Sequence, residues 1–282
     1  MKTLLLPVDF TATSANAVAF AIEWCKKYGY ERMILLKTFY DSMYENLIVA
    51  AEYNNVNQDY LNRQRQEAIE ELQALCRRVA AEVGHGTKVI TAVSEFPLLR
   101  GIFEVIQNEK PELIIVGSDN HDYSSSSIIA GNVISIAKAS PVRVLVVPAD
   151  ARYQPVEQVL LPYNFNMLND LHRVSSLRTS PYWADIKLLV LNLETNQQVI
   201  KDPQKLHEAE DKFRHLLQNF DHQIFYTTDK SVINGIAGFT KAHPVQLILA
   251  LPGKHSFLYT LTHKSISEAI YRNAKQPVLI LK

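Results

Sequence analysis

The feature that most constrains the fold of this chain is an internal repeat. Residues 4–10 read LLLPVDF and residues 159–165 read VLLPYNF, which keeps the proline and the phenylalanine in the same register. Self-similarity at a fixed spacing indicates that one structural unit occurs twice in the chain. The length of 282 residues agrees with this, because a domain usually holds roughly 100 to 200 residues. Two domains of similar fold are therefore predicted.

The first half alternates apolar runs with helical patterns. Its strands are predicted at residues 4–10, 32–39, 88–93, 112–116 and 142–147, and its helices at residues 12–27, 60–83, 97–108 and 133–139. This alternation is typical of βαβ units, in which parallel strands form a sheet with helices on both faces. The first half is therefore predicted to be a doubly wound α/β domain.

The second half follows the same order of elements. Its strands are predicted at residues 159–165, 187–191, 224–226, 247–250 and 278–281, and its helices include residues 202–220 and 231–242. Between the halves, residues 148–155 are polar and without periodicity, which is typical of a connector. We therefore expect a first domain at residues 1–150 and a second at residues 154–282.

An anion cradle is predicted after the fourth strand of the first half. The apolar run 113–116 ends at Gly117, where the missing Cβ allows a sharp turn and a close approach by a ligand. After an irregular loop, Gly131 and Asn132 open the helical run to Ala139, whose free N–H groups and positive dipole end would face Gly117. Most strand-to-helix turns of this kind bind no ligand, so the residues around this turn must indicate whether it binds an anion.

Polar residues near this turn have both functional and ordinary interpretations. Asp9 could orient an adenine or ribose group, but an aspartate between a strand and a Thr/Ser-rich helix start is also an ordinary capping residue. Residues 124–127 are serines that could bind or accept phosphate, although such a run is more often a flexible loop.

At these residues the chain resembles the universal stress protein family, in the tandem form with two domains in one polypeptide. The resemblance rests on residues 7–10 before the Thr/Ser-rich helix start, on residues 113–117 with their glycine loop, and on Ser140 and Pro141 before a valine-rich strand. It implies two tandem Rossmann-like domains of the adenine nucleotide alpha hydrolase-like type, each a five-stranded parallel sheet of order 3-2-1-4-5. In many members it also implies an adenine nucleotide beside the first and fourth strands, where doubly wound sheets bind ligands.

The resemblance also assigns candidate nucleotide-binding residues. Members that bind ATP look alike in one sequence pattern: a glycine, two residues of any kind, a second glycine, nine residues of any kind, a third glycine and then Ser or Thr. Here Gly117 and Gly131 match the first and third glycines, whereas Asn120 stands at the second. Ten residues, not nine, separate Asn120 from Gly131, and Asn132 replaces the hydroxyl residue. Asparagine tolerates positive φ and its amide can bond phosphate. The nucleotide site is therefore predicted at Asp9, Gly117, Asn120, Gly131 and Asn132.

The loop charges affect which ligand is expected. Asp119 and Asp122 place negative charge where phosphates would lie, which Coulomb repulsion disfavours unless a divalent cation lies between them. The predicted ligand of the first domain is ATP or another adenine nucleotide, with Mg²⁺ as the candidate cation.

The second domain is predicted to carry a degenerate pseudo-site. Asn164 replaces the aspartate of the first half, and residues 251–254 replace the glycine turn. Pro252 removes an N–H donor that the cradle would need, and Lys264 and Ser265 stand at the final glycine and hydroxyl positions.

Composition argues against several classes of function. Lys plus Arg and Asp plus Glu both number 29, so no net charge attracts nucleic acid or an anionic membrane. No apolar run reaches the roughly 20 residues that span a bilayer, and no signal-peptide pattern precedes the first strand, so a cytoplasmic location is expected. Cys25 and Cys76 lack metal-site spacing and are expected to be buried structural thiols.

The sequence leaves three functions open. The first is a cytoplasmic universal stress protein with regulatory adenine-nucleotide binding in domain 1. The alternative is a stress-response interaction scaffold in which both sites are vestigial. The third, which the sequence favours least, is a slow ATPase or self-phosphorylating protein that uses residues 124–127, because no catalytic motif such as a Ser-His-Asp order, HExxH or Walker A occurs. The closing strands at residues 144–147 and 278–281 are expected to pair within the chain, which would hide two sheet edges, and association of two chains stays open.

Overall fold

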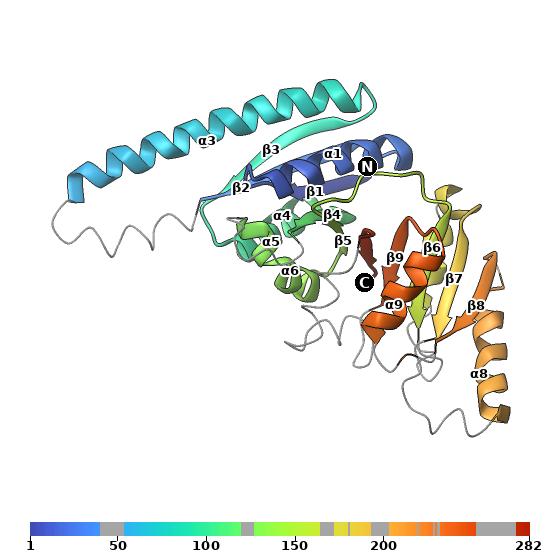
Figure 1. Ribbon diagram of the computed structural model, residues 1–282. Coiled ribbons are helices and arrows are strands. Elements are labelled where there is room, and N and C mark those ends of the chain that lie inside the picture. Colours follow the sequence, from blue (N-terminus) through green and yellow to red (C-terminus); the bar gives the residue numbers. More distant parts are fainter. Residues whose placement is uncertain are drawn as a thin grey trace. The chain divides into compact units, whose positions relative to one another are not determined.

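A computed structural model of the protein describes residues 1–39, 54–119, 127–163, 172–179, 181–192, 203–218, 220–227, 229, 232–251 and 275–282. Strands and helices alternate along these ranges, which confirms the predicted α/β class (Figure 1). The described residues form two compact units, residues 1–142 and residues 143–282. None of the described helices has both the length and the apolar character that a membrane span requires.

The first unit contains four parallel strands in the order β3-β2-β1-β4. The strands are β1 (Thr3–Pro7), β2 (Arg32–Thr38), β3 (Lys88–Ser94) and β4 (Leu113–Ser118). The helices are α1 (Ala12–Tyr28), α3 (Asn54–Val83), α4 (Leu98–Glu109), α5 (Ile128–Gly131) and α6 (Val133–Ala139). Helices α1 and α3 cover one face of the sheet, and α4, α5 and α6 lie on the other (Figure 1).

The central strands and the first helix form where the sequence predicts them. Every residue of β1 and β4 is buried, as expected for strands covered on both faces. Helix α1 begins after Thr11, whose side-chain oxygen accepts the Ser14 N–H, and ends at Gly29 in the left-handed conformation, with φ of 63°. Two helical features differ from the prediction, because α3 begins at Asn54 and the short α5 precedes α6.

The second unit holds six strands in the order β5-β10-β9-β6-β7-β8. They are β5 (Arg143–Pro148), β6 (Gln158–Tyr163), β7 (Lys187–Asn192), β8 (His222–Tyr226), β9 (Leu247–Ala250) and β10 (Val278–Ile280). The helical segments are α7 (His172–Ser175), η2 (Ser176–Thr179), η3 (Pro181–Trp183), α8 (Pro203–Leu216) and α9 (Val232–Ala242). From β8 to β10 all neighbours are parallel, and counted from β6 their order is 3-2-1-4-5.

Strand β5 groups with the second unit because of its partner strand. It pairs with β10 in antiparallel fashion, with Leu145 opposite Leu279. The boundary between the compact units therefore falls before Arg143, ahead of the polar connector at residues 148–155. The domain limits drawn from the sequence remain a prediction.

The two thiols differ in burial. Cys25 on α1 is only 1% exposed, as expected for a structural thiol, and burial raises its pKa from an ordinary 9.0 to about 12. Cys76 on α3 is only partly buried, with its thiol 3.6 Å from the Val89 carbonyl oxygen, so the expectation of a fully buried thiol is wrong there.

The buried thiol predicts a pH-dependent stability. The unfolded chain releases the Cys25 proton near its ordinary pKa, whereas the folded chain holds it to about pH 12. The contribution of Cys25 is therefore complete below about pH 8 and declines as the pH rises between the two values. Urea unfolding should show that the wild type loses about 1 to 2 kcal/mol more than Cys25→Ala between about pH 8 and about pH 10. Burial raises the Cys76 pKa as well, but Cys76 is only partly buried, so Cys76→Ala should change the slope less than Cys25→Ala does. Identical slopes in the wild type and Cys25→Ala would contradict the burial of Cys25.

Candidate functional site

Asp9 lies directly beyond β1, in the turn that leads into α1. Its Oδ1 accepts hydrogen bonds from the Thr11 hydroxyl at 2.7 Å and from the Thr11 N–H at 3.3 Å. The Asp9 N–H donates to the Ser14 hydroxyl oxygen at 3.3 Å. One carboxylate oxygen thus braces the start of α1, which is the ordinary capping role that the sequence allows.

The second carboxylate oxygen of Asp9 reaches the segment that follows β4. Oδ2 accepts a hydrogen bond from the Ser127 hydroxyl at 2.7 Å and from the Ile129 N–H at 3.3 Å. These partners are about 120 residues away in sequence, yet all belong to the first unit. Asp9 and the start of α5 therefore meet at the carboxyl ends of β1 and β4. In the order β3-β2-β1-β4, the strands that follow β1 in the chain lie on one side of it until β4 is added on the other side, so the strand order reverses between β1 and β4.

The amide donors of this segment are already used within the protein. Ser127 caps α5 by accepting the Ala130 N–H at 3.1 Å, and its carbonyl accepts the Gly131 N–H at 3.2 Å. The Asn132 N–H donates to the Ile129 carbonyl at 3.0 Å. Helix α6 begins at Val133 after Asn132, where the apolar pattern predicts it, but the N–H groups of Gly131 and Asn132 themselves are bonded within and after α5. That the first N–H groups of α6 face Gly117 stays a prediction.

Gly117 has a packing role that the sequence did not indicate. It lies inside β4 and its φ is not positive, so it forms no sharp turn. A Cβ built there would lie 2.7 Å from the Thr13 carbonyl oxygen and 3.0 Å from Thr13 Cγ2. The missing side chain therefore lets the first turn of α1 approach β4.

Gly131 and Asn132 differ from Gly117 in their surroundings. A Cβ on Gly131 would meet no atom within 4 Å, so this position has open space in front of it. The Asn132 side-chain amide donates to the Ile128 carbonyl at 2.9 Å, which closes the end of α5. Of the two, only Gly131 leaves room for a ligand to approach the backbone.

Several predicted positions lie outside the described residues. They are Asn120, Asp122 and residues 124–126 of the first half, and Asn164, residues 252–254, Lys264 and Ser265 of the second. The second-half pseudo-site is therefore represented only by Leu251, which is buried.

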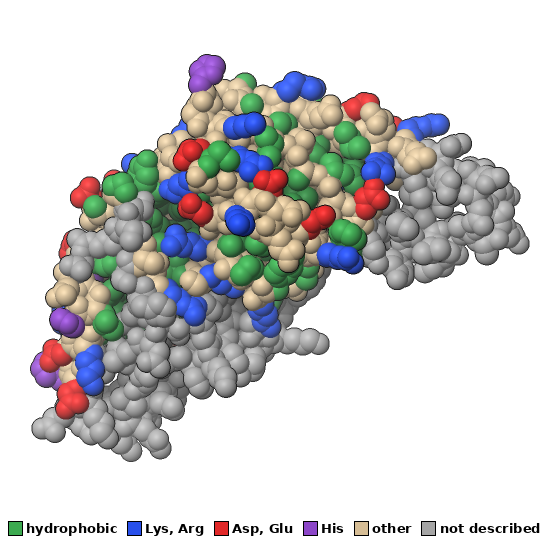
Figure 2. All heavy atoms as spheres, turned by 180° about the vertical axis from the view of Figure 1, so that it is seen from behind, with side chains coloured by type: hydrophobic (Ala, Val, Ile, Leu, Met, Phe, Trp, Pro, Cys, Tyr) green, Lys and Arg blue, Asp and Glu red, His purple; other side chains and the backbone are tan. Residues whose placement is uncertain are grey.

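The described surface carries no large area of a single charge on the face seen in Figure 2, where basic and acidic side chains are interspersed. Among the described residues, no group of three or more His, Cys, Asp or Glu side chains is arranged to hold a metal ion.

Perturbed titratable groups also occur in the second unit, between α8 and β8. Burial opposes ionisation of Glu210, but hydrogen bonds from Tyr226 at 2.5 Å and from Arg214 outweigh it and lower the Glu210 pKa. Burial and the Glu210 contact together raise the Tyr226 pKa. Tyr226 is half exposed, so these residues form a surface cross-link between helix and strand, not a pocket.

Solved structures resemble the chain in fold. A universal stress protein from Archaeoglobus fulgidus DSM 4304 is 14% identical, covers 99% of this chain and 98% of its own, and gives a TM-score of 0.63. A functionally unknown protein from Pseudomonas aeruginosa PAO1 is 15% identical, with 100% and 92% coverage and a TM-score of 0.57. The cytoplasmic domain of a prokaryotic cation chloride cotransporter is 12% identical, with 99% and 95% coverage and a TM-score of 0.52. Identities this low show the fold alone.

The sequence itself matches a family model. No curated protein matches the chain. The model described as the universal stress protein family, however, matches residues 1–148, which is more than half of the 282 residues and includes every predicted nucleotide-binding position. The chain belongs to the universal stress protein family.

Proposed function

We propose that the protein is a cytoplasmic stress-associated regulator that binds an adenine nucleotide in its first half. The observation that carries the proposal is the Asp9 carboxylate, which joins the end of β1 to Ser127 and Ile129 beyond β4. This is the crevice where doubly wound sheets bind ligands. The open space at Gly131 lies on the same short segment.

Nucleotide binding at this crevice has to exchange internal hydrogen bonds for ligand bonds. The Ser127 hydroxyl and the Ile129 N–H now donate to Asp9 and would turn to phosphate oxygens. The freed Asp9 oxygen would accept a ribose or adenine donor. Asp9 and Asp119 are both acidic, so a triphosphate would bind together with Mg²⁺, which offsets the repulsion.

The two domains have different functions in this proposal. Domain 1, residues 1–150, carries the nucleotide, and domain 2, residues 154–282, is a pseudo-site that contributes its sheet. Binding would stabilise the segment that carries α5 and alter the surface offered to partner proteins.

A second function is favoured by a different observation. Asp9, Ser127 and the amides of α5 satisfy one another, so this part of the crevice is complete without a ligand. A stress-response interaction scaffold with vestigial sites would have this arrangement. The two functions differ in whether adenine nucleotides stabilise the protein.

Substitution of the two motif glycines separates packing from binding. Gly117→Ala should lower the free energy of unfolding by about 1 to 3 kcal/mol, because its Cβ would overlap the Thr13 carbonyl. Gly131→Ala should leave stability at or slightly above that of the wild type, since alanine favours helices and the space is open. Urea unfolding measures both. In calorimetry, Gly131→Ala should also weaken ATP binding, and unchanged affinity would remove Gly131 from the site.

Loss of the Asp9 carboxylate tests the nucleotide proposal directly. Calorimetric titration with ATP and Mg²⁺ should detect binding to the wild type and binding weaker by up to about tenfold to Asp9→Ala. The variant loses a ligand bond of about 1.5 to 3 kcal/mol, which is partly offset because the two internal bonds of Asp9 no longer have to break. Asp150→Ala, an exposed aspartate on the connector, is the matched control and should bind like the wild type. Circular dichroism verifies that each variant is folded. Absence of heat and of a thermal shift in the wild type at millimolar ATP would favour the scaffold.

A further inference from the structure

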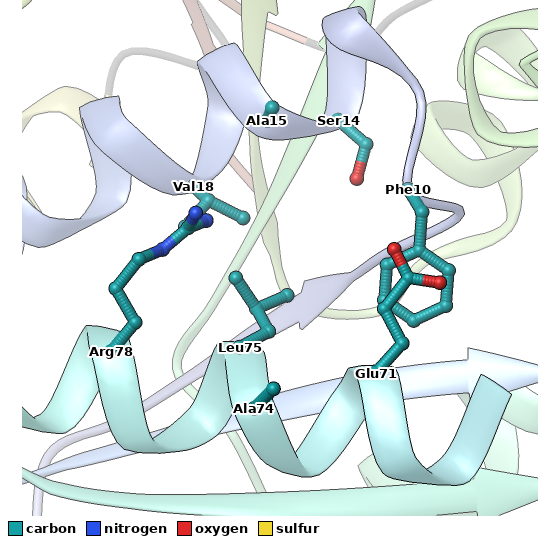
Figure 3. A pocket seen from close by; sticks show the side chains of 8 residues that line it. All are labelled: Phe10, Ser14, Ala15, Val18, Glu71, Ala74, Leu75 and Arg78. Carbon is teal, nitrogen blue, oxygen red and sulfur yellow. The ribbon is translucent and has the colours of Figure 1, made fainter. Parts of the chain in front are cut away.

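A groove of about 380 Å³ lies between α1 and α3, apart from the Asp9 carboxylate (Figure 3). Its apolar floor includes Val18 of α1 and Leu75 of α3, and the small side chain of Ala74 keeps it open. Glu71 and Arg78 lie at opposite ends of the stretch of α3 that lines it (Figure 3). The groove is therefore apolar in the middle and oppositely charged at its ends.

The spacing of the lining residues on α3 sets the length of the groove. Glu71, Leu75 and Arg78 recur at intervals of four and three, which places them on one face of the helix. Seven residues at 1.5 Å each separate the two charged positions by about 10 Å along the axis. This distance is the separation of the two backbone positions, and a ligand that meets both charged side chains must be elongated.

Phe10 makes the acidic end suited to an ammonium group. Its φ of 63° is a left-handed conformation that bulky residues rarely adopt. Phe10 and Glu71 both line this end of the groove. The Lys37 ammonium is 5.1 Å from the centre of the same ring, which shows that a cation can approach it. A carboxylate next to an aromatic ring is a favourable environment for an ammonium ion.

We propose that this groove binds a linear zwitterion of the ω-amino carboxylate class. The ligand ammonium lies between Glu71 and Phe10, its methylene chain crosses Val18 and Leu75, and its carboxylate meets the Arg78 guanidinium. A chain of about eight carbons is the probe, because its extended length is comparable to the roughly 10 Å between the backbone positions of Glu71 and Arg78. The site uses none of the predicted nucleotide-binding residues, so it stands or falls independently of the proposed function.

Calorimetry with ω-aminooctanoate, octanoate and octylamine tests the proposal on the full-length protein. The zwitterion should bind about fivefold more tightly than either singly charged analogue, because an exposed ion pair contributes up to about a fivefold factor. Glu71→Gln should make ω-aminooctanoate and octanoate bind alike. Arg78→Gln should make ω-aminooctanoate and octylamine bind alike. Each substitution thus removes the advantage of one end only.

Two further sets of variants keep the test decisive. Ala74→Trp fills the groove from an exposed position and should abolish binding of all three compounds while the circular dichroism spectrum is unchanged. Glu67→Gln and Arg77→Gln alter exposed charges of α3 that do not line the groove, and should bind like the wild type. No binding of ω-aminooctanoate at millimolar concentration, equal affinity for the three compounds, or binding that survives Ala74→Trp would overturn the proposal.

Discussion

The first half of this protein depends on one carboxylate that holds two separate parts of the chain together. Asp9 binds Thr11, the N-cap residue of α1, through Oδ1 and the start of α5 through Oδ2. Both contacts are at helix starts, where backbone N–H groups lack partners within the helix. A negative charge at such ends is favourable, so one side chain stabilises two helix starts and fixes the loop end of β4 beside β1.

The same region shows that a motif glycine can serve packing instead of ligand contact. Gly117 is needed because α1 approaches β4 closely at Thr13, and any Cβ would overlap a backbone carbonyl. Other glycines follow this logic: a Cβ on Gly101 would lie 3.1 Å from Ser94, and one on Gly235 would lie 3.3 Å from Thr227. In each unit a helix glycine, on α4 or α9, thus packs against a hydroxyl residue at the end of the preceding strand, β3 or β8. This shared contact agrees with the internal repeat of the sequence.

The sequence predicted the elements whose signals are long and regular. Buried strands β1 and β4 have unbroken apolar runs, and α1 has both a hydroxyl cap at Thr11 and a terminal glycine at Gly29. Helix α5 was missed because four residues give no periodicity and its cap, Ser127, sits at the end of a serine run. The use of its N–H groups by Asp9 could not be predicted either, since that contact joins residues about 120 positions apart.

The internal hydrogen bonds of Asp9 also set a condition on nucleotide affinity. A ligand that takes over the Ser127 hydroxyl and the Ile129 N–H must first break two bonds, each with a net contribution of about 0.5 to 1.5 kcal/mol. Together they would weaken binding by roughly one to two powers of ten relative to an open crevice with the same contacts. A site closed in this way responds only when nucleotide is abundant or when a partner favours the open form, because a ligand shifts an equilibrium by no more than its differential affinity. That conditional response suits a regulator better than a constitutive nucleotide carrier.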